Sequence, residues 1–524
     1  MKKWLPVILA TVLLASPLLR AATPPNTLVV AISLNGIISL DPAESFETVS
    51  TSSLDALYQA LVKSDRVNPT QLNPDLATSW QVGADGRSLI FTLDPKATFA
   101  SGNPVLADDV IYSFTRAVKL NKTPAFILNE LGWKPENVDA QFKKRDDHQL
   151  EVRWPADIGS DLALRLLSSG VASVVDSKVV SSHSVNDDFG SGWLKNHSAG
   201  SGAYQLRNYI PQQALVLTAN THGVKQPKLK QVILKDVADP GARRLLLIQG
   251  DADVAYDLGA DQFSALANQP GVRISTSPGG KIYYLGFNTQ DKQAPTLGNP
   301  AFWQAARWLV DYEGISKNLL NGQFIVHQNF LPEGFDGAAK AQPFKLDVDK
   351  AKKTLSDAGI KSGTRFALTV INQPPYTDIA QALQASFAQA DIHIDVQPVV
   401  ESELWTKMRS RNFQSIFVYW GPDYIDPNTN ASTFAYNVPN GPKTLAWRVG
   451  WDIPELSRQT QAAAAERDRE KRQALYQTLQ QEIRERSPFV VMLQGMRLVA
   501  VRDNLKDVKQ SLANSMLYYD DISK

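Results

Sequence analysis

The 524-residue sequence contains no cysteine. Disulfide bonds, cysteine-ligated zinc, thiol catalysis and lipid attachment through an N-terminal cysteine are therefore excluded. An excess of one charge is also missing, because 54 Lys and Arg residues face 53 Asp and Glu residues. No basic stripe dominates the sequence, so it lacks the charge pattern of a nucleic-acid-binding protein. Low-complexity segments and short internal repeats are absent too, and the composition is that of an ordinary globular protein.

A long apolar run occurs only at the start of the chain. Lys2 and Lys3 precede the uncharged segment LPVILATVLLASPLL (5–19), and the small residue Ala22 follows it. This layout is typical of a secretory signal peptide, which we expect to cover residues 1–22. A membrane anchor is the alternative, but a membrane-spanning helix needs about 20 predominantly apolar residues and this run is shorter.

The rest of the chain predicts an exported protein that is not inserted in a membrane after signal cleavage. An exported chain without a lipid anchor is retained only where a second membrane encloses it, so we predict the periplasm of a two-membrane bacterium. About 500 residues exceed the size of a single hydrophobic core, which indicates two to four domain-sized units.

The sequence patterns of common enzymes are absent. There is no G-x-S-x-G, no G-x-x-x-x-G-K-[ST], no H-E-x-x-H and no G-x-G-x-x-G. The six histidines form no i, i+3 or i, i+4 pair, so no helix face is prepared for a metal ion. We therefore expect no enzymatic activity, no bound metal and no cofactor.

Local patterns predict short strands alternating with helices. The run TLVVAIS (27–33) is rich in β-branched residues and predicts a buried strand. Asp85-Gly86 separates two further strand-like runs and predicts a hairpin. Apolar spacing predicts helices over 54–62, 107–118 and 302–320, the second with acidic residues at its start. This alternation indicates an α/β fold with mixed sheets.

Several segments, taken in order, form a recognisable set. LNPDLATSW (72–80) and DGRSLIFTLDPKATFASGNPVLADDVIYSF (85–114) contain Leu-Ala, Trp, Asp-Gly, Gly-x-Pro and Ala-Asp-Asp-Val at characteristic places. GSGAYQL (200–206), YLGFNTQ (284–290) and REKRQALYQTLQQEIRERSPFVVML (469–493) continue the set. Together they resemble family 5 of the extracytoplasmic solute-binding proteins, the peptide/nickel type that serves ABC importers.

The resemblance implies a periplasmic-binding-protein type II-like clamp of α/β class, with two lobes, an extra domain (the cluster C architecture) and a ligand cleft between the lobes. Residues 23–56, 196–276 and 494–524 are expected to form the core domain of the first lobe. Residues 57–195 then form the extra domain, and residues 277–493 form the second lobe. The implied partners are ABC permease subunits with their ATPases, and we expect a monomer.

The segment YWGPDYIDPNTN is similar to the W-x-x-D element of peptide-binding relatives, in which the aspartate pairs with the ligand's α-ammonium. Asp423 holds that position, and Trp420 and Tyr424 lie beside it. A carboxylate in a closed cleft needs a cationic or hydrogen-bonding partner, which a ligand ammonium supplies. The alternative is that Asp423 only ties a proline-rich turn.

Three more ligand-binding candidates come from two loops. The segment NQPPY ends in Tyr376, and its alignment puts Pro374 where dipeptide-binding relatives carry an arginine for the ligand carboxylate. Longer peptides or a non-peptide amine fit this difference better than a dipeptide. The loop SLNGIISLDP (33–42) follows the first strand and borders the ligand in relatives, so Asn35 and Ser39 are candidates.

The predicted function is capture of a peptide or a peptide-like, amine-bearing solute in the periplasm and its delivery to an ABC permease. A nickel- or metallophore-binding member of the same family is the first alternative. A periplasmic peptide-binding chaperone is a further alternative, because a fold alone does not determine function. A hydrolase on an unrelated scaffold is the last alternative.

Overall fold

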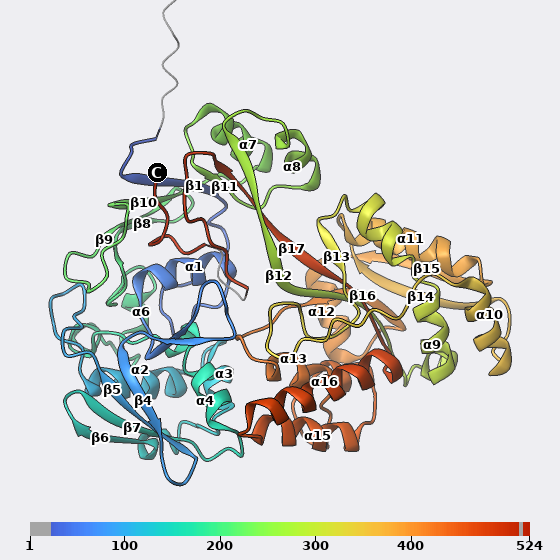
Figure 1. Ribbon diagram of the computed structural model, residues 1–524, viewed down its shortest axis with the longest axis horizontal. Helices are drawn as coiled ribbons and strands as arrows, with labels where there is room; N and C mark the ends of the chain where they lie inside the picture. Colours follow the sequence, from blue (N-terminus) through green and yellow to red (C-terminus); the bar gives the residue numbers. More distant parts are fainter. Residues whose placement is uncertain (1–22, 513–516) are drawn as a thin grey trace, which may run out of the picture.

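The computed structural model describes residues 23–512 and 517–524, so the signal peptide predicted for residues 1–22 lies outside the described residues. Two lobes lie side by side and are joined across the middle by the long strands β12 and β17 (Figure 1). One 11-stranded sheet runs through both lobes, and a 4-stranded and a 2-stranded sheet accompany it. Every helix in the described part of the chain is too short or too polar to cross a bilayer.

The spatial order of the strands differs from their order in the chain. The large sheet contains, in spatial order, β15 (Ile392–Val399), β14 (Thr364–Ile371), β16 (Ser415–Trp420), β12 (Val272–Phe287), β17 (Phe489–Arg502), β11 (Val254–Ala255), β1 (Thr27–Ile32), β10 (Gln231–Asp236), β9 (Ala214–Ala219) and β8 (Tyr204–Ile210), with β13 (Phe324–Val326) paired to β17. The small sheets contain β4 (Ala77–Val82), β5 (Ser88–Leu93), β7 (Gln149–Arg153) and β6 (Phe142–Asp146), and β2 (Val62–Ser64) with β3 (Leu72–Pro74).

The helices cover the sheets in both lobes (Figure 1). Those before the crossing strands are α1 (Thr48–Leu57), α2 (Ala107–Leu120), α3 (Ala125–Asn129), α4 (Ser160–Leu166), α5 (Ser177–Ser182), α6 (Ser191–Leu194), α7 (Pro240–Gln249) and α8 (Ala260–Leu266). Those of the second lobe are α9 (Pro300–Trp308), α10 (Val348–Asp357), α11 (Tyr376–Ala388), α12 (Glu401–Ser410), α13 (Asn428–Phe434), α14 (Leu445–Arg448), α15 (Pro454–Ala465) and α16 (Arg469–Arg486). Short 3-10 turns lie at Val138–Gln141, Gly170–Ala172 and Pro295–Gly298, and Gly314–Leu319 is a π-helix.

The strands β12 and β17 carry the chain between the lobes. Their antiparallel pairing runs from Val272 opposite Arg502 in the first lobe to Gly286 opposite Phe489 in the second. The register breaks between Pro278 and Ile282, so residues 279–281 lie outside the regular ladder. We call residues 279–281 the hinge segment, because a break in a two-strand connection lets neighbouring lobes change their relative angle.

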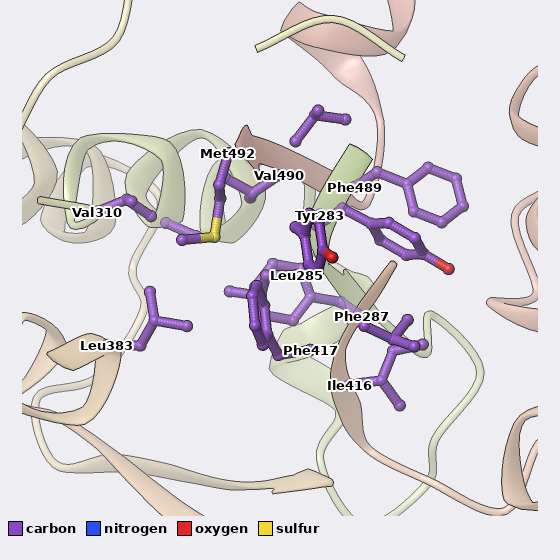
Figure 2. Packing of buried hydrophobic residues seen from close by; sticks show 14 of the residues in the cluster. Tyr283, Leu285, Phe287, Val310, Leu383, Ile416, Phe417, Phe489, Val490 and Met492 are labelled. Atoms are coloured by element: carbon purple, nitrogen blue, oxygen red, sulfur yellow. The ribbon is translucent and has the colours of Figure 1, made fainter. Parts of the chain in front are cut away.

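Three large hydrophobic cores lie along the molecule. One combines residues from 28–58, 175–256 and 499–522, and the next is built almost entirely from residues 43–174. The third belongs to the second lobe and runs from Ile282 to Leu493, with Leu512 added. Figure 2 shows its centre, where buried side chains of β12, β16 and β17 meet; the labelled ones include Leu285, Phe287, Ile416, Phe417, Phe489 and Met492.

Two of the local predictions are confirmed. β4 and β5 form an antiparallel hairpin at Asp85-Gly86, and Gly86 has a φ of 66°, which a residue with a side chain adopts only with strain. The predicted helix over 107–118 is α2, and the carboxylate of Asp109 accepts the backbone N–H of Leu106 at 2.9 Å. That bond satisfies one donor at the helix start, where an acidic residue is also favoured by the helix dipole.

The predicted helix over 302–320 is wrong. Regular α-helix ends at Trp308, and a π-helix over Gly314–Leu319 follows. The carboxylate of Asp311 accepts the N–H of Gly314 at 2.9 Å. An aspartate that binds a nearby backbone N–H offers the chain an alternative to helical hydrogen bonding, so the helix stops although the apolar spacing continues.

The helix predicted over 54–62 begins earlier and ends earlier, as α1 (Thr48–Leu57). A second part of the chain closes its end, because the N–H of Gly202 donates to the carbonyl oxygen of Leu57 at 3.0 Å. A Cβ atom on Gly202 would lie 2.3 Å from the carbonyl oxygen of Ala56. Glycine is therefore required at position 202 for the close approach of two backbones.

We expect Gly202→Ala to lower the free energy of unfolding by about 1–3 kcal/mol, the usual effect of forcing an extra carbon into a packed contact. Gly170→Ala is the matched control, since a Cβ atom there meets nothing within 4 Å. Urea unfolding of both variants measures the difference. Equal stability of the two variants would contradict the close approach at Leu57.

Candidate functional site

The loop after β16 reaches from the second lobe into the first. The hydroxyl of Tyr424 donates to Glu130 Oε2 at 2.7 Å, and Asn428 Nδ2 lies 3.3 Å from the same oxygen. Tyr424 is 3% exposed and packs in the core built from residues 43–174. Burial raises the pKa of Glu130 to about 8, so its carboxyl group keeps a proton at neutral pH. This contact docks the loop against the end of α3.

Asp426 fixes the same loop from the other side. Arg472 of α16 makes two bonds to its carboxylate, Nη1 to Oδ2 at 2.8 Å and Nη2 to Oδ1 at 2.7 Å. Arg165 of α4 lies 3.5 Å from Oδ2. A bidentate arginine–carboxylate pair imposes geometry as well as energy. Helix α4 thus lies beside α15 and α16 (Figure 1), and the two lobes meet around one buried carboxylate.

Asp423 lies between these two anchors. Its backbone N–H donates to Thr429 Oγ1 at 3.0 Å. Its carboxylate makes no hydrogen bond and no ion pair with any residue that the structure describes. Burial raises the pKa of this carboxyl group to about 7. The rise reflects the free-energy cost of a partly buried charge without a partner, and a ligand cation placed here would lower that cost.

A cavity of about 210 Å³, the Asp423 cavity, opens in front of this side chain. Helix α1 and strand β2 form much of its wall, and its charged lining includes Asp75, Lys63, Arg66 and Asp520. Lys63 Nζ lies 2.8 Å from Asp75, and Arg66 Nη1 lies 2.8 Å from Asp520. Lys225 and Asp55 also line the cavity, and Lys225 Nζ lies 2.8 Å from Asp520, so the lining carries three basic side chains and, with Asp423, four acidic ones.

A second cavity of about 580 Å³ lies at the hinge segment, and we call it the hinge cavity. Both lobes line it. The first turn of α1 and Asp257 come from the first lobe, and Tyr283 and Phe324 come from the second. Lys281 and Arg497 line it from the two crossing strands. A cleft that both lobes line and a break in the crossing strands borders is positioned to close on a ligand.

Of the residues singled out in the sequence, Asp423 and Tyr424 line the Asp423 cavity. Tyr376 is 7% exposed, and its ring centroid lies 6.1 Å from that of Tyr283, a wall residue of the hinge cavity. Trp420 pairs with Ile282 across β16 and β12 and is partly buried against the second-lobe core.

The other two candidates lie in the loop over 33–42. Asn35 is exposed beside Gly36, which lines the hinge cavity. Ser39 is fully buried, and its Oγ accepts the N–H of Asp41 at 3.1 Å. Asn35 is thus at the edge of the cleft, whereas Ser39 holds the loop in shape.

Sequence reasoning missed Glu130, Asp426 and Lys281. Nothing local marks the first two, since their roles depend on contacts between distant segments. The sequence Ser-Pro-Gly-Gly-Lys over 277–281 did carry a signal, because Pro and Gly-Gly interrupt a strand pattern. Within residues 23–512 and 517–524, no group of three or more His, Asp or Glu side chains is arranged to hold a metal ion.

Two lobes, two crossing strands and a cleft with a partly buried carboxylate that is unpaired among the described residues define a ligand-capturing clamp, the hinged architecture of periplasmic binding proteins. Residues 71–442 match the family described as "Bacterial extracellular solute-binding proteins, family 5 Middle". The chain belongs to this family. The predicted family, and the predicted two-lobed α/β clamp, are confirmed.

Known relatives cover nearly the whole chain. The protein named "Probable D,D-dipeptide-binding periplasmic protein DdpA" of Escherichia coli K12 is 28% identical over 520 residues, which cover 98% of this chain and 96% of DdpA. The structure of HbpA2 from Haemophilus parasuis has a TM-score of 0.80 at 19% identity, covering 95% of this chain and 99% of HbpA2. DppA from Helicobacter pylori, in complex with the peptide STSA, has a TM-score of 0.75 at 20% identity, covering 95% and 98%.

Proposed function

We propose that the protein captures a short peptide or a peptide-like, amine-bearing solute between its lobes and delivers it to an ABC permease. The observation that carries the proposal is Asp423, a partly buried carboxylate that faces a cleft and has no partner among the described residues. A ligand ammonium is the partner that such a carboxylate needs. The name of the DdpA relative supports D,D-dipeptides as the first ligands to test.

The proposal extends to location, partners and organisation. The protein acts in the periplasm as a monomer after removal of residues 1–22, contacts permease subunits with their ATPases, and catalyses no reaction. The first lobe comprises 23–56, 196–276 and 494–524, with 57–195 as its extra domain. The second lobe comprises 277–493. The three hydrophobic cores support this division in outline, but Val175, Val180 and Leu194, which it assigns to the extra domain, pack in the first-lobe core.

A thermal-shift screen of residues 23–524 tests the function. The pools are L,L- and D,D-dipeptides, tripeptides, longer peptides, free amino acids, and nickel with and without chelators. A ligand present at about 100 times its dissociation constant adds about 2.7 kcal/mol to the free energy of unfolding. We expect a peptide pool to raise the melting temperature.

The screen separates the alternatives. A shift with a peptide pool supports the proposal and narrows the length and stereochemistry of the ligand. A shift only with chelated nickel would support the metallophore alternative and contradict the role given to Asp423. A shift with all unfolded or extended peptides alike, without length preference, would indicate a chaperone.

A further inference from the structure

The loop after β16 is held against α3 of the first lobe by a contact that exists only while the lobes are together. Tyr424 of this loop is 3% exposed, because it packs among the buried side chains of the core built from residues 43–174. Its hydroxyl donates to Glu130 Oε2 at 2.7 Å. Glu130 is partly buried at the end of α3. Moving the lobes apart withdraws Tyr424 from this core and returns Glu130 to water.

A chain of hydrogen bonds ends at Glu130, and every member of the chain donates towards it. Arg472 Nη2 donates to the hydroxyl of Tyr476, which donates to Asn428 Oδ1, each at 3.3 Å. Asn428 Nδ2 donates to the hydroxyl of Tyr424, also at 3.3 Å, and Tyr424 donates to Glu130. Burial raises the pKa of both phenols, so they stay neutral. Glu130 is the final acceptor, and a neutral carboxyl group can accept this bond as well as a charged one.

The charges around Glu130 balance one another without it. Two cations enter this interface, Arg165 from α4 and Arg472 from α16. Asp426 lies 2.7 Å from Arg472 and 3.5 Å from Arg165. Asp161 lies 3.1 Å and 3.3 Å from the same two guanidinium groups. Among the residues that the structure describes, no Lys or Arg pairs with Glu130, so its charged form is a surplus negative charge in a partly desolvated interface.

The environment of Glu130 favours its protonated form when the lobes are together. Burial raises the pKa of Glu130 to about 8, with a contribution from the charges of Asp423 and Asp426. The hydrogen bonds from Tyr424 and Asn428 oppose this rise. When the lobes are apart, the same carboxyl group faces water, where a glutamate has a pKa of about 4.3. The two arrangements of the lobes therefore differ in how strongly they hold one proton.

We propose that closing the lobes binds one proton from solvent on Glu130, so that its contact with Tyr424 is a latch that acid strengthens and alkali releases. The inference goes beyond the proposed function, because the latch acts on the clamp whether or not a ligand is present. Glu130 holds its proton more strongly in the closed arrangement, so its contribution to closure is complete below about pH 4.3 and is lost as the pH rises through about 8. A ligand that binds the latched clamp leaves this proton in place, so the latch adds no pH dependence to ligand affinity below about pH 7.

Distances between two spin labels, measured on ligand-free residues 23–524, test the inference. The chain has no cysteine, so Asp157→Cys and Glu470→Cys place one label just before α4 and one in the first turn of α16, both at exposed positions. The parent protein also carries Asp423→Asn, which removes the other carboxyl group of this interface whose pKa is raised. We expect the ratio of closed to open protein to fall about 10- to 100-fold from pH 6 to pH 9. Glu130→Gln, which is neutral and can still accept a hydrogen bond, should abolish this change.

Glu136→Gln is the matched control, because Glu136 is an exposed glutamate shortly after α3 and lies outside both cavities. It should keep the full dependence on pH. The same distance distribution of the parent protein at pH 6 and pH 9 would overturn the inference, and this comparison needs no change at Glu130. A dependence on pH that Glu130→Gln leaves intact would overturn it as well. Since no ligand is present, either result leaves the proposed function standing, and a ligand screen without a shift leaves the latch standing.

Discussion

Replacing Asp423 by asparagine weakens the binding of an amine-bearing peptide by about 10- to 150-fold, which corresponds to the 1.5–3 kcal/mol of a charged hydrogen bond. Asparagine keeps the shape of the side chain but removes the charge that attracts the ammonium. Calorimetry with the peptide found in the screen measures the loss. Asp452→Asn is the matched control, because Asp452 is an exposed second-lobe aspartate outside both cavities.

The same site makes binding depend on pH. Burial raises the pKa of Asp423 to about 7, so the empty protein loses the carboxylate charge as the pH falls through 7. The ligand ammonium stays protonated below its own pKa of about 7.7–8.0. We therefore expect the affinity to fall roughly five- to tenfold for each pH unit below 7, and Asp423→Asn to abolish this dependence. An affinity that is flat between pH 7 and pH 5.5 would contradict the assignment.

Without a ligand, Asp423 also makes the stability of the folded protein depend on pH, and the sign of its pKa shift gives the direction of that dependence. The folded pKa is above the unfolded value, so the folded protein holds the proton more strongly than the unfolded chain does. The contribution of Asp423 to stability is thus present at low pH and is lost as the pH rises through about 7. A bound ammonium reverses this loss, which makes ligand-induced stabilisation larger at pH 8 than at pH 6.

Replacing Arg116 by methionine lowers the free energy of unfolding by about 3–5 kcal/mol, because it leaves the buried carboxylate of Asp41 without its partner. The guanidinium of Arg116 makes two bonds to Asp41, each 2.8 Å long, and the two side chains are 1% and 0% exposed. The pair joins α2 to the loop after β1. Urea unfolding of residues 23–524 measures the effect.

Two controls separate this pair from an ordinary ion pair. Lys119→Met, on the same helix, removes a pair with Asp139 whose side chains are 30% and 67% exposed, and should cost at most about 1 kcal/mol. Adding Asp41→Leu to Arg116→Met removes the orphaned charge and should recover much of the stability. If Arg116→Met costs no more than Lys119→Met, the pair does not have the role assigned to it.

The sequence predicted local structure correctly where the contacts that determine this structure lie between neighbouring residues. The Asp85-Gly86 turn and the acidic start of α2 depend on bonds within a few residues, and both were predicted correctly. The helix over 302–320 was predicted wrongly, because apolar spacing cannot register the bond from the carboxylate of Asp311 to Gly314. The end of α1 was predicted wrongly for a different reason. The N–H that binds the carbonyl oxygen of Leu57 belongs to Gly202, which lies 145 positions further along the chain.

The residues of the candidate site also differ in whether the sequence could predict them. Asp423 was found because it follows a strand inside a family-like segment, and a carboxylate in such a place has few roles. Lys281 was not found, since 142 residues separate it from Asp423 and neither sequence neighbourhood contains the other. The contact of Gly421 with the hinge segment packs the segment before Asp423 against Lys281.

The sequence by itself determined the family, the α/β class and the aspartate on which the proposed function rests, because turns, caps and ordered motifs are properties of short segments. Only the tertiary structure decided that Asp423 lacks a partner among the described residues and that the cavity at the hinge segment is lined by both lobes. The physical reason is that burial and the neutralisation of charge depend on every group within a few ångströms, and those groups come from segments that folding alone brings together.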